Sequence, residues 1–254
     1  MECKDLLLSI TRCHELASAT GDSSHPCAIV VRSQTGQIYQ VPEPWTGHIE
    51  TAPILFIGSN PGIHESEYFP RSNWSDPDTI DFFTRRFDRD AGYTYQKPNG
   101  GAQYVKVYEG NNGPVVSRHW VRFWSMIKNH AKAIAQDQPE AGKDYAITEM
   151  VHCKSNNEAG VRNALSHCSR KWLPAIMEQS GAAIIVLLGD HPRDAAVGLW
   201  GLDASQRVQF DVPIAGRNRA VVILPHPNFR GKRKIEDYVG QQELEQLRSK
   251  LPRA

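Results

Sequence analysis

The sequence lacks the features that would place it in a specialised class of proteins. No run of apolar residues approaches the roughly 18 that a membrane-spanning helix requires, so we expect no membrane as a partner. The 29 basic and 28 acidic residues nearly cancel, which excludes nucleic-acid binding through overall charge and leaves only a local patch for it. Internal repeats and low-complexity tracts are also missing. With 40% hydrophobic and 22% charged residues, the composition is that of an ordinary globular protein.

Cysteine is scarce, and the odd number of five residues, together with their spacing, does not suggest a disulfide framework. Residues 1–5 carry acids and lead into no sustained apolar stretch, so no signal peptide is predicted. We therefore expect an intracellular, cytoplasmic protein, associated with the nucleoid if the source is bacterial. At 254 residues the chain is long enough to bury a core without a disulfide or a metal.

Four short apolar segments predict the strands of one buried sheet. They lack the polar alternation of half-exposed strands, and segments with helical periodicity separate them. Strands covered on both faces are typical of parallel sheets in three-layer domains. We therefore predict an α/β fold, a three-layer α/β/α sandwich around a short, mainly parallel four-stranded sheet, as a single domain over residues 1–254. The predicted strands are Pro53–Ile57, Asp144–Val151, Ala182–Leu188 and Ala220–Leu224.

Two less regular regions are predicted outside this core. Residues 1–48 are expected to hold a helix over residues 4–18 and a β-hairpin between residues 28 and 41. Residues 63–113 are rich in Gly, Pro, Asn and Asp, and we expect a long inserted loop region with one short helix at 79–87.

Further helices are predicted at residues 117–135, 163–179 and 236–251, and another helical segment is predicted to begin at residues 189–192. The first of these has Ser117 as its expected N-cap. Its aromatic residues recur at helical spacing, so we expect them to face the core. These aromatic residues are Trp120, Phe123 and Trp124.

Three unusual segments directly follow predicted strands: Gly58–Gly62, residues 149–157 and His226–Asn228. In an open α/β sheet the carboxyl ends of parallel strands meet at one edge, and ligands bind there. The segments are far apart in the sequence but are expected to converge in this topology. Their convergence predicts a functional site at that edge.

The first and last of these segments contain residues suited to holding a ligand. Gly58–Gly62 predicts a tight turn that lets the backbone approach a ligand, although a plain strand–helix turn has the same composition. His226 lies between two prolines, which restrict its backbone; a structural loop histidine is the alternative. A run of cations then either binds phosphates or forms a solvated face. These cations are Arg230, Lys232, Arg233 and Lys234.

These motifs together resemble the uracil-DNA glycosylase superfamily over roughly residues 50–245. The strand ending in Gly58-Ser59-Asn60-Pro61-Gly62 resembles the first motif of its mismatch-specific and single-strand-selective branches. The strand ending in His226-Pro227-Asn228 resembles the His-Pro-Ser motif that closes the site. The segment from Tyr145 to Cys153, followed by a helix with Cys168, resembles the iron–sulfur (family 4) branch. Because the motifs come from different branches, no single branch defines the substrate.

The resemblance implies a DNA glycosylase of base excision repair, which flips a damaged or deaminated base out of DNA and hydrolyses its N-glycosidic bond. By motif match, Asn60 positions the attacking water, and His226 donates a hydrogen bond to the leaving base. Gly58, Ser59 and Glu149 would bind the base. The matched motifs offer no lysine for a covalent intermediate, so we expect a monofunctional enzyme whose chemistry requires no cofactor.

The implied partner is DNA that contains a damaged base, and we expect a monomer to bind it. Tyr68 or Phe69, shortly after the first motif, would stack on the flipped base, with packing inside the loop as their alternative role. The loop after His226 would wedge into the duplex and hold phosphates. The expected DNA contacts are Asn228, Phe229, Arg230, Lys232, Arg233 and Lys234.

One residue departs from the family pattern. Glu149 stands where the iron–sulfur branch has an asparagine that reads the edge of uracil. An ionised carboxylate only accepts hydrogen bonds, so it would repel the O4 atom of uracil. Either burial keeps Glu149 protonated, or the preferred base is not uracil, or another residue reads the base. Glu149 pointing away from the pocket is a further alternative.

The cysteines add a possible cofactor site by the same resemblance. Cys153 and Cys168, with 14 residues between them, resemble the last two cluster ligands of the iron–sulfur branch. The Cys-x-x-Cys that supplies the other two ligands in that branch is missing, and Cys13 and Cys27 are the nearest substitutes. Four thiolates are required for a [4Fe–4S] cluster, and buried free thiols are the alternative.

Two other functions stay open. A protein of the same fold that binds lesions or single strands with weak or no catalysis is the main alternative, because Glu149 replaces the asparagine. An unrelated α/β enzyme acting on free nucleosides is the second, because the overall charge is weak.

Overall fold

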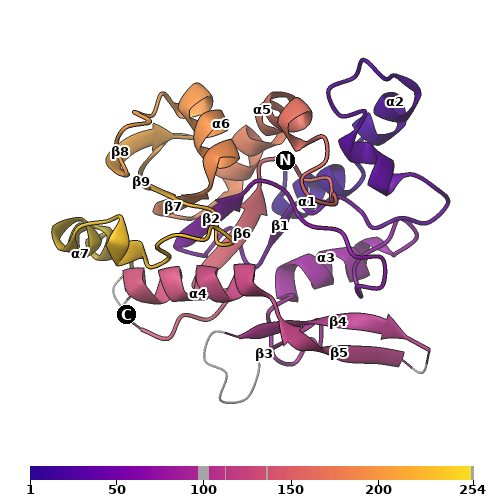
Figure 1. Ribbon diagram of the computed structural model, residues 1–254, viewed down its shortest axis with the longest axis horizontal. Helices are drawn as coiled ribbons and strands as arrows, with labels where there is room; N and C mark the ends of the chain where they lie inside the picture. Colours follow the sequence, from indigo (N-terminus) through magenta and orange to yellow (C-terminus); the bar gives the residue numbers. More distant parts are fainter. Residues whose placement is uncertain (97–102, 112, 136, 253–254) are drawn as a thin grey trace.

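A six-stranded sheet forms the centre of the computed structural model, which describes residues 1–96, 103–111, 113–135 and 137–252 (Figure 1). Its four middle strands run parallel. Every residue of these strands is buried except the first two of β9, as the apolar segments predict. The two-residue strand β1 and the seven-residue strand β8 add antiparallel edges, so the sheet has six strands rather than four. The strand order is β1 (Trp45–Thr46), β6 (Tyr145–Glu149), β2 (Ile54–Gly58), β7 (Ile184–Leu188), β9 (Arg217–Leu224) and β8 (Val208–Ile214).

Helices cover both faces of the sheet, which confirms the three-layer α/β/α prediction (Figure 1). One apolar core lies between the sheet and four helices, and a second core lies between the opposite face and two helices. The first layer comprises α1 (Cys3–Thr11), α3 (Asp76–Arg85), α5 (Val161–Gln179) and α6 (Asp190–Trp200), and the second comprises α4 (Arg122–Ala135) and α7 (Gln241–Ser249). No helix in the described ranges is long and apolar enough to cross a membrane.

The region from residue 63 to residue 113 is more regular than predicted. Its helix is present as α3, which Ser75 caps by accepting a hydrogen bond from the Asp78 amide. A separate three-stranded antiparallel sheet follows, and its last strand takes up Ser117, so that residue is not a helix cap. Its strands are β3 (Thr94–Gln96), β4 (Tyr104–Gly110) and β5 (Gly113–Trp120).

The N-terminal region differs from the prediction in two ways. The helix expected over residues 4–18 is broken into α1 and α2 (Glu15–Gly21). The expected hairpin is replaced by the 3-10 helix η1 (Val30–Gln34). The adjacent Val30 and Val31 are both buried. In a hairpin with one solvent-exposed face, neighbouring side chains would alternate between buried and exposed positions. The C-terminal helix is likewise shorter than expected, because the 3-10 turn η2 (Ile235–Asp237) precedes α7.

Candidate functional site

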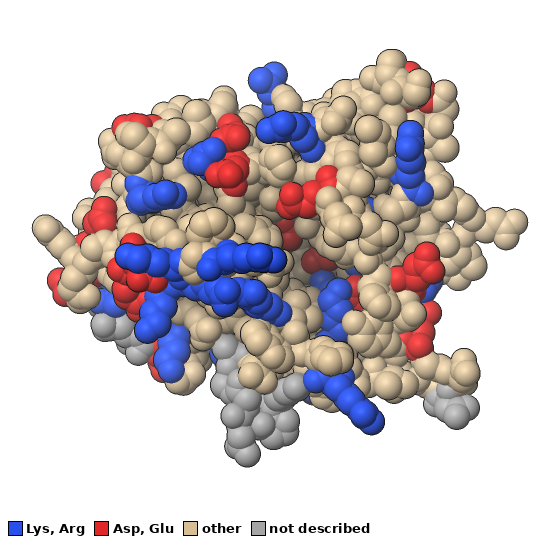
Figure 2. Space-filling view, viewed as in Figure 1, with Lys and Arg blue, Asp and Glu red and all other residues tan. Residues whose placement is uncertain are grey.

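A pocket of about 820 Å³ opens at the carboxyl ends of the parallel strands, as the convergence of the three segments predicts. Asn60 follows β2, Glu149 ends β6 and His226 follows β9, and all three line this pocket. Figure 2 shows a hollow in the middle of the corresponding face, with Lys and Arg side chains gathered beside it. We call this cavity the strand-end pocket.

Asn60 is held in one orientation by its amide nitrogen. Its Nδ2 donates to the carbonyl oxygens of Pro61 (3.0 Å) and Cys153 (3.2 Å) and to the Ser155 hydroxyl (2.8 Å). Because carbonyl oxygens only accept, the amide group cannot be reversed. Its Oδ1 has no donor within the described part of the chain and is free to accept from a water.

His226 is presented to the same pocket as a neutral donor. Its Nδ1 accepts a hydrogen bond from the Asn228 amide at 3.2 Å, which places the ring proton on Nε2. Burial lowers the pKa of His226, although the Glu158 carboxylate partly opposes the shift. Gly189 packs close to its Cβ, and a side chain there would crowd it. The result is an imidazole that donates from Nε2 without carrying a charge.

Aromatic residues of α4, rather than those after the first motif, form one wall of the strand-end pocket. Phe123 lies 5.7 Å from the His226 ring, and Trp124 lies beside it. Trp124 is buried in the core, as predicted, and Phe123 packs against that core, although both also line the pocket. The prediction is wrong for Trp120, which is 43% exposed on β5.

Tyr68 and Phe69 do not stack in this pocket, contrary to the prediction. Phe69 is fully buried, and its ring packs against Phe82 and Phe83. Tyr68 packs against Trp74. Phe69 belongs to the apolar core and Tyr68 packs against it, and neither residue lines the pocket.

Glu149 lies at the bottom of the pocket with 5% of its surface exposed. Its Oε2 is buried without a hydrogen-bond partner among the described residues. Gly58, its neighbour in register on β2, leaves the space that this carboxyl fills, because a Cβ at Gly58 would overlap it. Burial, with smaller contributions from the Glu43 and Glu158 carboxylates, raises the pKa of Glu149 well above its usual range. Glu149 therefore lines the pocket with an unpaired carboxyl oxygen, in surroundings that disfavour its charged form. Ser59, also predicted to bind the base, is buried in the wall.

A buried ion network that the sequence did not reveal supports the pocket wall. Glu67 accepts from Arg86 (2.8 Å) and Lys106 (2.6 Å), and Lys154 lies 3.4 Å away. Burial alone would raise the pKa of Glu67, but these cations lower it to about 2. Arg86 also donates to Glu43 at 2.9 Å. Charged residues spread from Glu43 to Lys154 give no sequence pattern, so only the fold brings them together.

The cations after His226 form an exposed loop at the edge of the pocket. We call Arg230, Lys232, Arg233 and Lys234 the basic loop; all four are exposed. Asn228 and Phe229 line the pocket mouth, and Phe229 is 53% exposed. The Arg233 guanidinium donates to the Phe229 carbonyl oxygen at 3.2 Å, which ties the loop to this aromatic residue. The arrangement places a wedge-shaped apolar side chain beside four cations.

The four cysteines singled out from the sequence line one small cavity, which we call the cysteine pocket. Cys13 comes from between α1 and α2, Cys27 from before η1, Cys153 from after β6 and Cys168 from α5. The other walls are largely apolar, and Lys171 lies beside them. Burial raises the pKa of every one of these thiols. Four thiols lining one small cavity match the number of thiolate donors that a [4Fe–4S] cluster requires.

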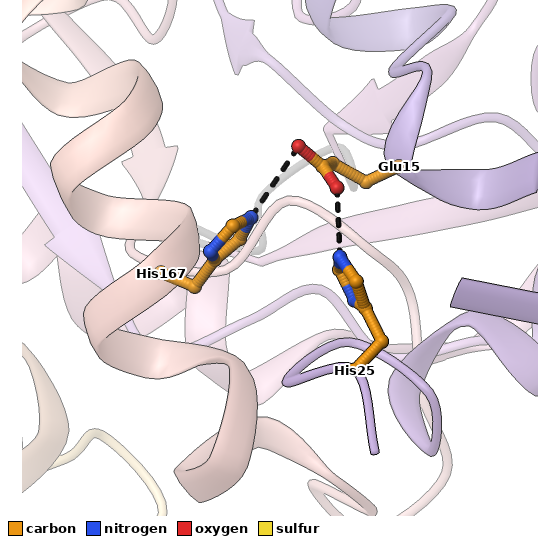
Figure 3. Close-up of side chains that lie close together, drawn as sticks. All are labelled: Glu15, His25 and His167. Carbon is orange, nitrogen blue, oxygen red and sulfur yellow. Dashed lines mark ion pairs between the residues drawn. The ribbon is translucent and has the colours of Figure 1, made fainter. Parts of the chain in front are cut away.

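Glu15, His25 and His167 lie close together (Figure 3), and Glu15 and His167 also line the cysteine pocket. The Glu15 carboxylate contacts His25 Nε2 at 2.8 Å, His167 Nε2 at 3.4 Å and the Lys171 ammonium. The hydrogen bond from Lys171 is the largest cause of lowering the pKa of Glu15 to about 2. His25 Nδ1 accepts from the Cys27 amide, so its Nε2 carries the proton and is unsuited to bind a metal. This group therefore joins the segments that carry Cys13, Cys27 and Cys168.

Fold and pocket together define a three-layer α/β protein whose site lies at the ends of parallel strands and combines an oriented amide, a neutral imidazole and an aromatic wall. Residues 44–247 match the Uracil DNA glycosylase superfamily, and the chain belongs to that superfamily. Its members are typically DNA glycosylases. No curated protein matches the sequence.

Proposed function

We propose that the protein is a monofunctional DNA glycosylase that hydrolyses the N-glycosidic bond of a damaged or deaminated base. The observation that supports this most directly is that one pocket is lined both by Asn60, with its free Oδ1, and by His226, with its Nε2–H. One group accepts from a water, and the other donates to a leaving group. The aromatic wall formed by Phe123 and Trp124 offers a surface on which a flipped base stacks.

In this reaction the bond between the sugar C1′ and the base nitrogen breaks, and its electron pair leaves with the base. The Nε2–H of His226 stabilises the negative charge that develops on the base. A water held by Asn60 Oδ1 attacks C1′ as the sugar gains oxocarbenium character, and its proton passes to solvent. An amide is a weak base, but orienting the water is sufficient when bond breaking precedes attack.

The basic loop is proposed to hold the DNA backbone while Phe229 presses into the base stack. Its cations are exposed and lie beside the pocket mouth, so phosphates flanking a flipped nucleotide would reach them. The near-zero net charge makes this local patch the main source of affinity for DNA.

The cysteine pocket is proposed to hold a [4Fe–4S] cluster through Cys13, Cys27, Cys153 and Cys168. A bound cluster would supply structural cross-links between four segments and take no part in the hydrolysis. The Cys153 carbonyl accepts from Asn60, so the same residue would anchor the cluster and orient the catalytic amide.

Cleavage of labelled oligonucleotides tests the proposed activity. Each oligonucleotide carries one uracil, hypoxanthine, xanthine or mismatched thymine, as a single strand or a duplex, and alkali then cuts abasic sites. We expect cutting of at least one substrate, and its loss in Asn60→Ala and His226→Ala. Asn73→Ala, at an exposed position outside the pocket, is the matched control. Binding without cutting would instead favour a lesion-binding protein, which Glu149 in place of asparagine supports.

A further inference from the structure

Glu149 is a buried acid without a partner in the strand-end pocket. The residue is 5% exposed and lines the pocket, and its Oε2 has no hydrogen bond within the described ranges. Buried polar atoms are almost always paired, and leaving one unpaired is costly. Gly58 leaves room for the carboxyl group, so the side chain is accommodated rather than displaced. An orphaned polar group in a ligand pocket points to a ligand that satisfies it.

The charges around Glu149 favour its neutral form. Burial raises the pKa of Glu149 well above its usual range, and the negative charges of Glu43 and Glu158 raise it further. Three of the cations that line the pocket are paired elsewhere: Arg86 with Glu43 and Glu67, and Lys106 and Lys154 with Glu67. The remaining titratable groups that line the pocket are Arg162, Asp190, His191, Asp194 and His226.

We infer that Glu149 is a hydrogen-bond donor to the flipped base and selects bases that carry a carbonyl oxygen beside a ring N–H. A neutral carboxyl group offers one O–H donor and one C=O acceptor, which match the carbonyl oxygen and the N–H of such an edge. The pocket then holds two donors, the Glu149 O–H and the His226 Nε2–H. Negative charge on an oxo-base spreads onto its oxygens as the bond breaks, so both donors act more strongly in the transition state. This inference rests on the proposed glycosylase function.

Glu149→Gln and Glu149→Ala test it, because glutamine keeps a donor and an acceptor but does not ionise near neutral pH. Single-turnover excision is measured from pH 6 to pH 9 on uracil and on 4-thiouracil, whose sulfur is a poor acceptor. Wild-type excision should fall as the pH rises through the pKa of Glu149, and the glutamine variant should stay flat and within about 10-fold of wild type. The rate of single-turnover excision by the alanine variant should be about 100-fold lower than that of wild type, and this variant should no longer distinguish uracil from 4-thiouracil.

A second measurement separates failure of this inference from failure of the proposed function. Affinity is measured for an oligonucleotide with 2′-fluoro-deoxyuridine, which resists cleavage, so binding is read even if no base is excised. We expect the wild-type protein and the Glu149→Gln variant to bind this oligonucleotide equally well at neutral pH. As the pH rises, only the affinity of the wild-type protein should decrease. If the Glu149→Gln variant is as impaired as the Glu149→Ala variant and wild-type excision does not change with pH, Glu149 acts as an ionised acceptor and the inference is wrong. If alanine behaves as wild type, Glu149 does not contact the base.

Discussion

Asn60→Asp gives the sharpest test of how the catalytic amide is held. On chemical grounds alone, a carboxylate is a stronger base than an amide and should activate water better. The structure predicts the opposite result, because Asn60 Nδ2 faces two carbonyl oxygens, those of Pro61 and Cys153. Aspartate would replace a donor to both oxygens by a third acceptor. Only the Ser155 hydroxyl can turn to donate to it.

The size of the effect follows from the bonds that are lost. Each hydrogen bond contributes about 1 kcal/mol, so losing two costs about 2 kcal/mol before repulsion is added. For a chain of this size, that loss corresponds to a decrease in Tm of about 4–8 °C. Rotation of the carboxylate away from the carbonyls would misplace the water, and we expect a decrease of about 10- to 100-fold in single-turnover excision.

Thermal unfolding and single-turnover excision on the best substrate measure both effects. Ser155→Ala is the matched control, since it removes one acceptor and leaves a carbonyl for each amide hydrogen. The Ser155→Ala substitution should lower the free energy of unfolding by about 1 kcal/mol or less. An Asn60→Asp protein with unchanged Tm and equal or faster excision would refute the orientation of Asn60 described above.

Three further predictions concern other parts of the molecule. Replacing the four cations of the basic loop by glutamine should weaken DNA binding at low salt and reduce the slope of log K against log[salt] by about 3, as measured by anisotropy titration; an unchanged slope would mean that the loop is only a solvated face. Cys153→Ser should abolish binding of iron and sulfide on anaerobic reconstitution, whereas Cys3→Ser, outside the cysteine pocket, should not; equal iron content in both would exclude the cluster. Burial lowers the pKa of His130 from 6.5 to about 4. Between these two pH values His130 is therefore protonated in the unfolded chain and neutral in the folded chain. Stability should therefore fall as the pH drops from 6.5 towards 4. His130→Leu should reduce the dependence of Tm on pH in that window, while His152, whose pKa burial also lowers to about 4, retains part of it.

The buried parallel strands were the part of the fold most open to prediction, because apolar residues on both faces leave a continuous hydrophobic run. The edge strand β8 alternates buried and partly exposed residues and joins β9 through a turn at Ala215 and Gly216, both with positive φ. Ala215 carries no signal for that conformation, so its hairpin was missed. Val30 and Val31 favour a strand by propensity, but tertiary packing against the cysteine pocket holds them in a 3-10 helix.

The site could be predicted only where the backbone topology alone fixes it. Asn60 and His226 follow parallel strands, so the topology brings them together whatever their side chains do. The stacking aromatics depend on which way a loop turns, and sequence distance from the first motif favoured Tyr68 and Phe69 wrongly. Phe123 and Trp124 recur at helical spacing, a pattern that pocket-lining and core residues share.

A single segment, from Glu149 to Ser155, connects the parts of the site. Glu149 faces the pocket, the Cys153 side chain faces the cysteine pocket, and Lys154 reaches the buried Glu67. The Cys153 carbonyl and the Ser155 hydroxyl meanwhile fix the amide of Asn60. Because the backbone of Cys153 is shared, a shift of the segment that accompanies loss of a cysteine ligand would move the acceptors of the catalytic amide as well. Base contact, cysteine ligation and water positioning are therefore physically coupled, and a change to one of them in this segment will alter the others.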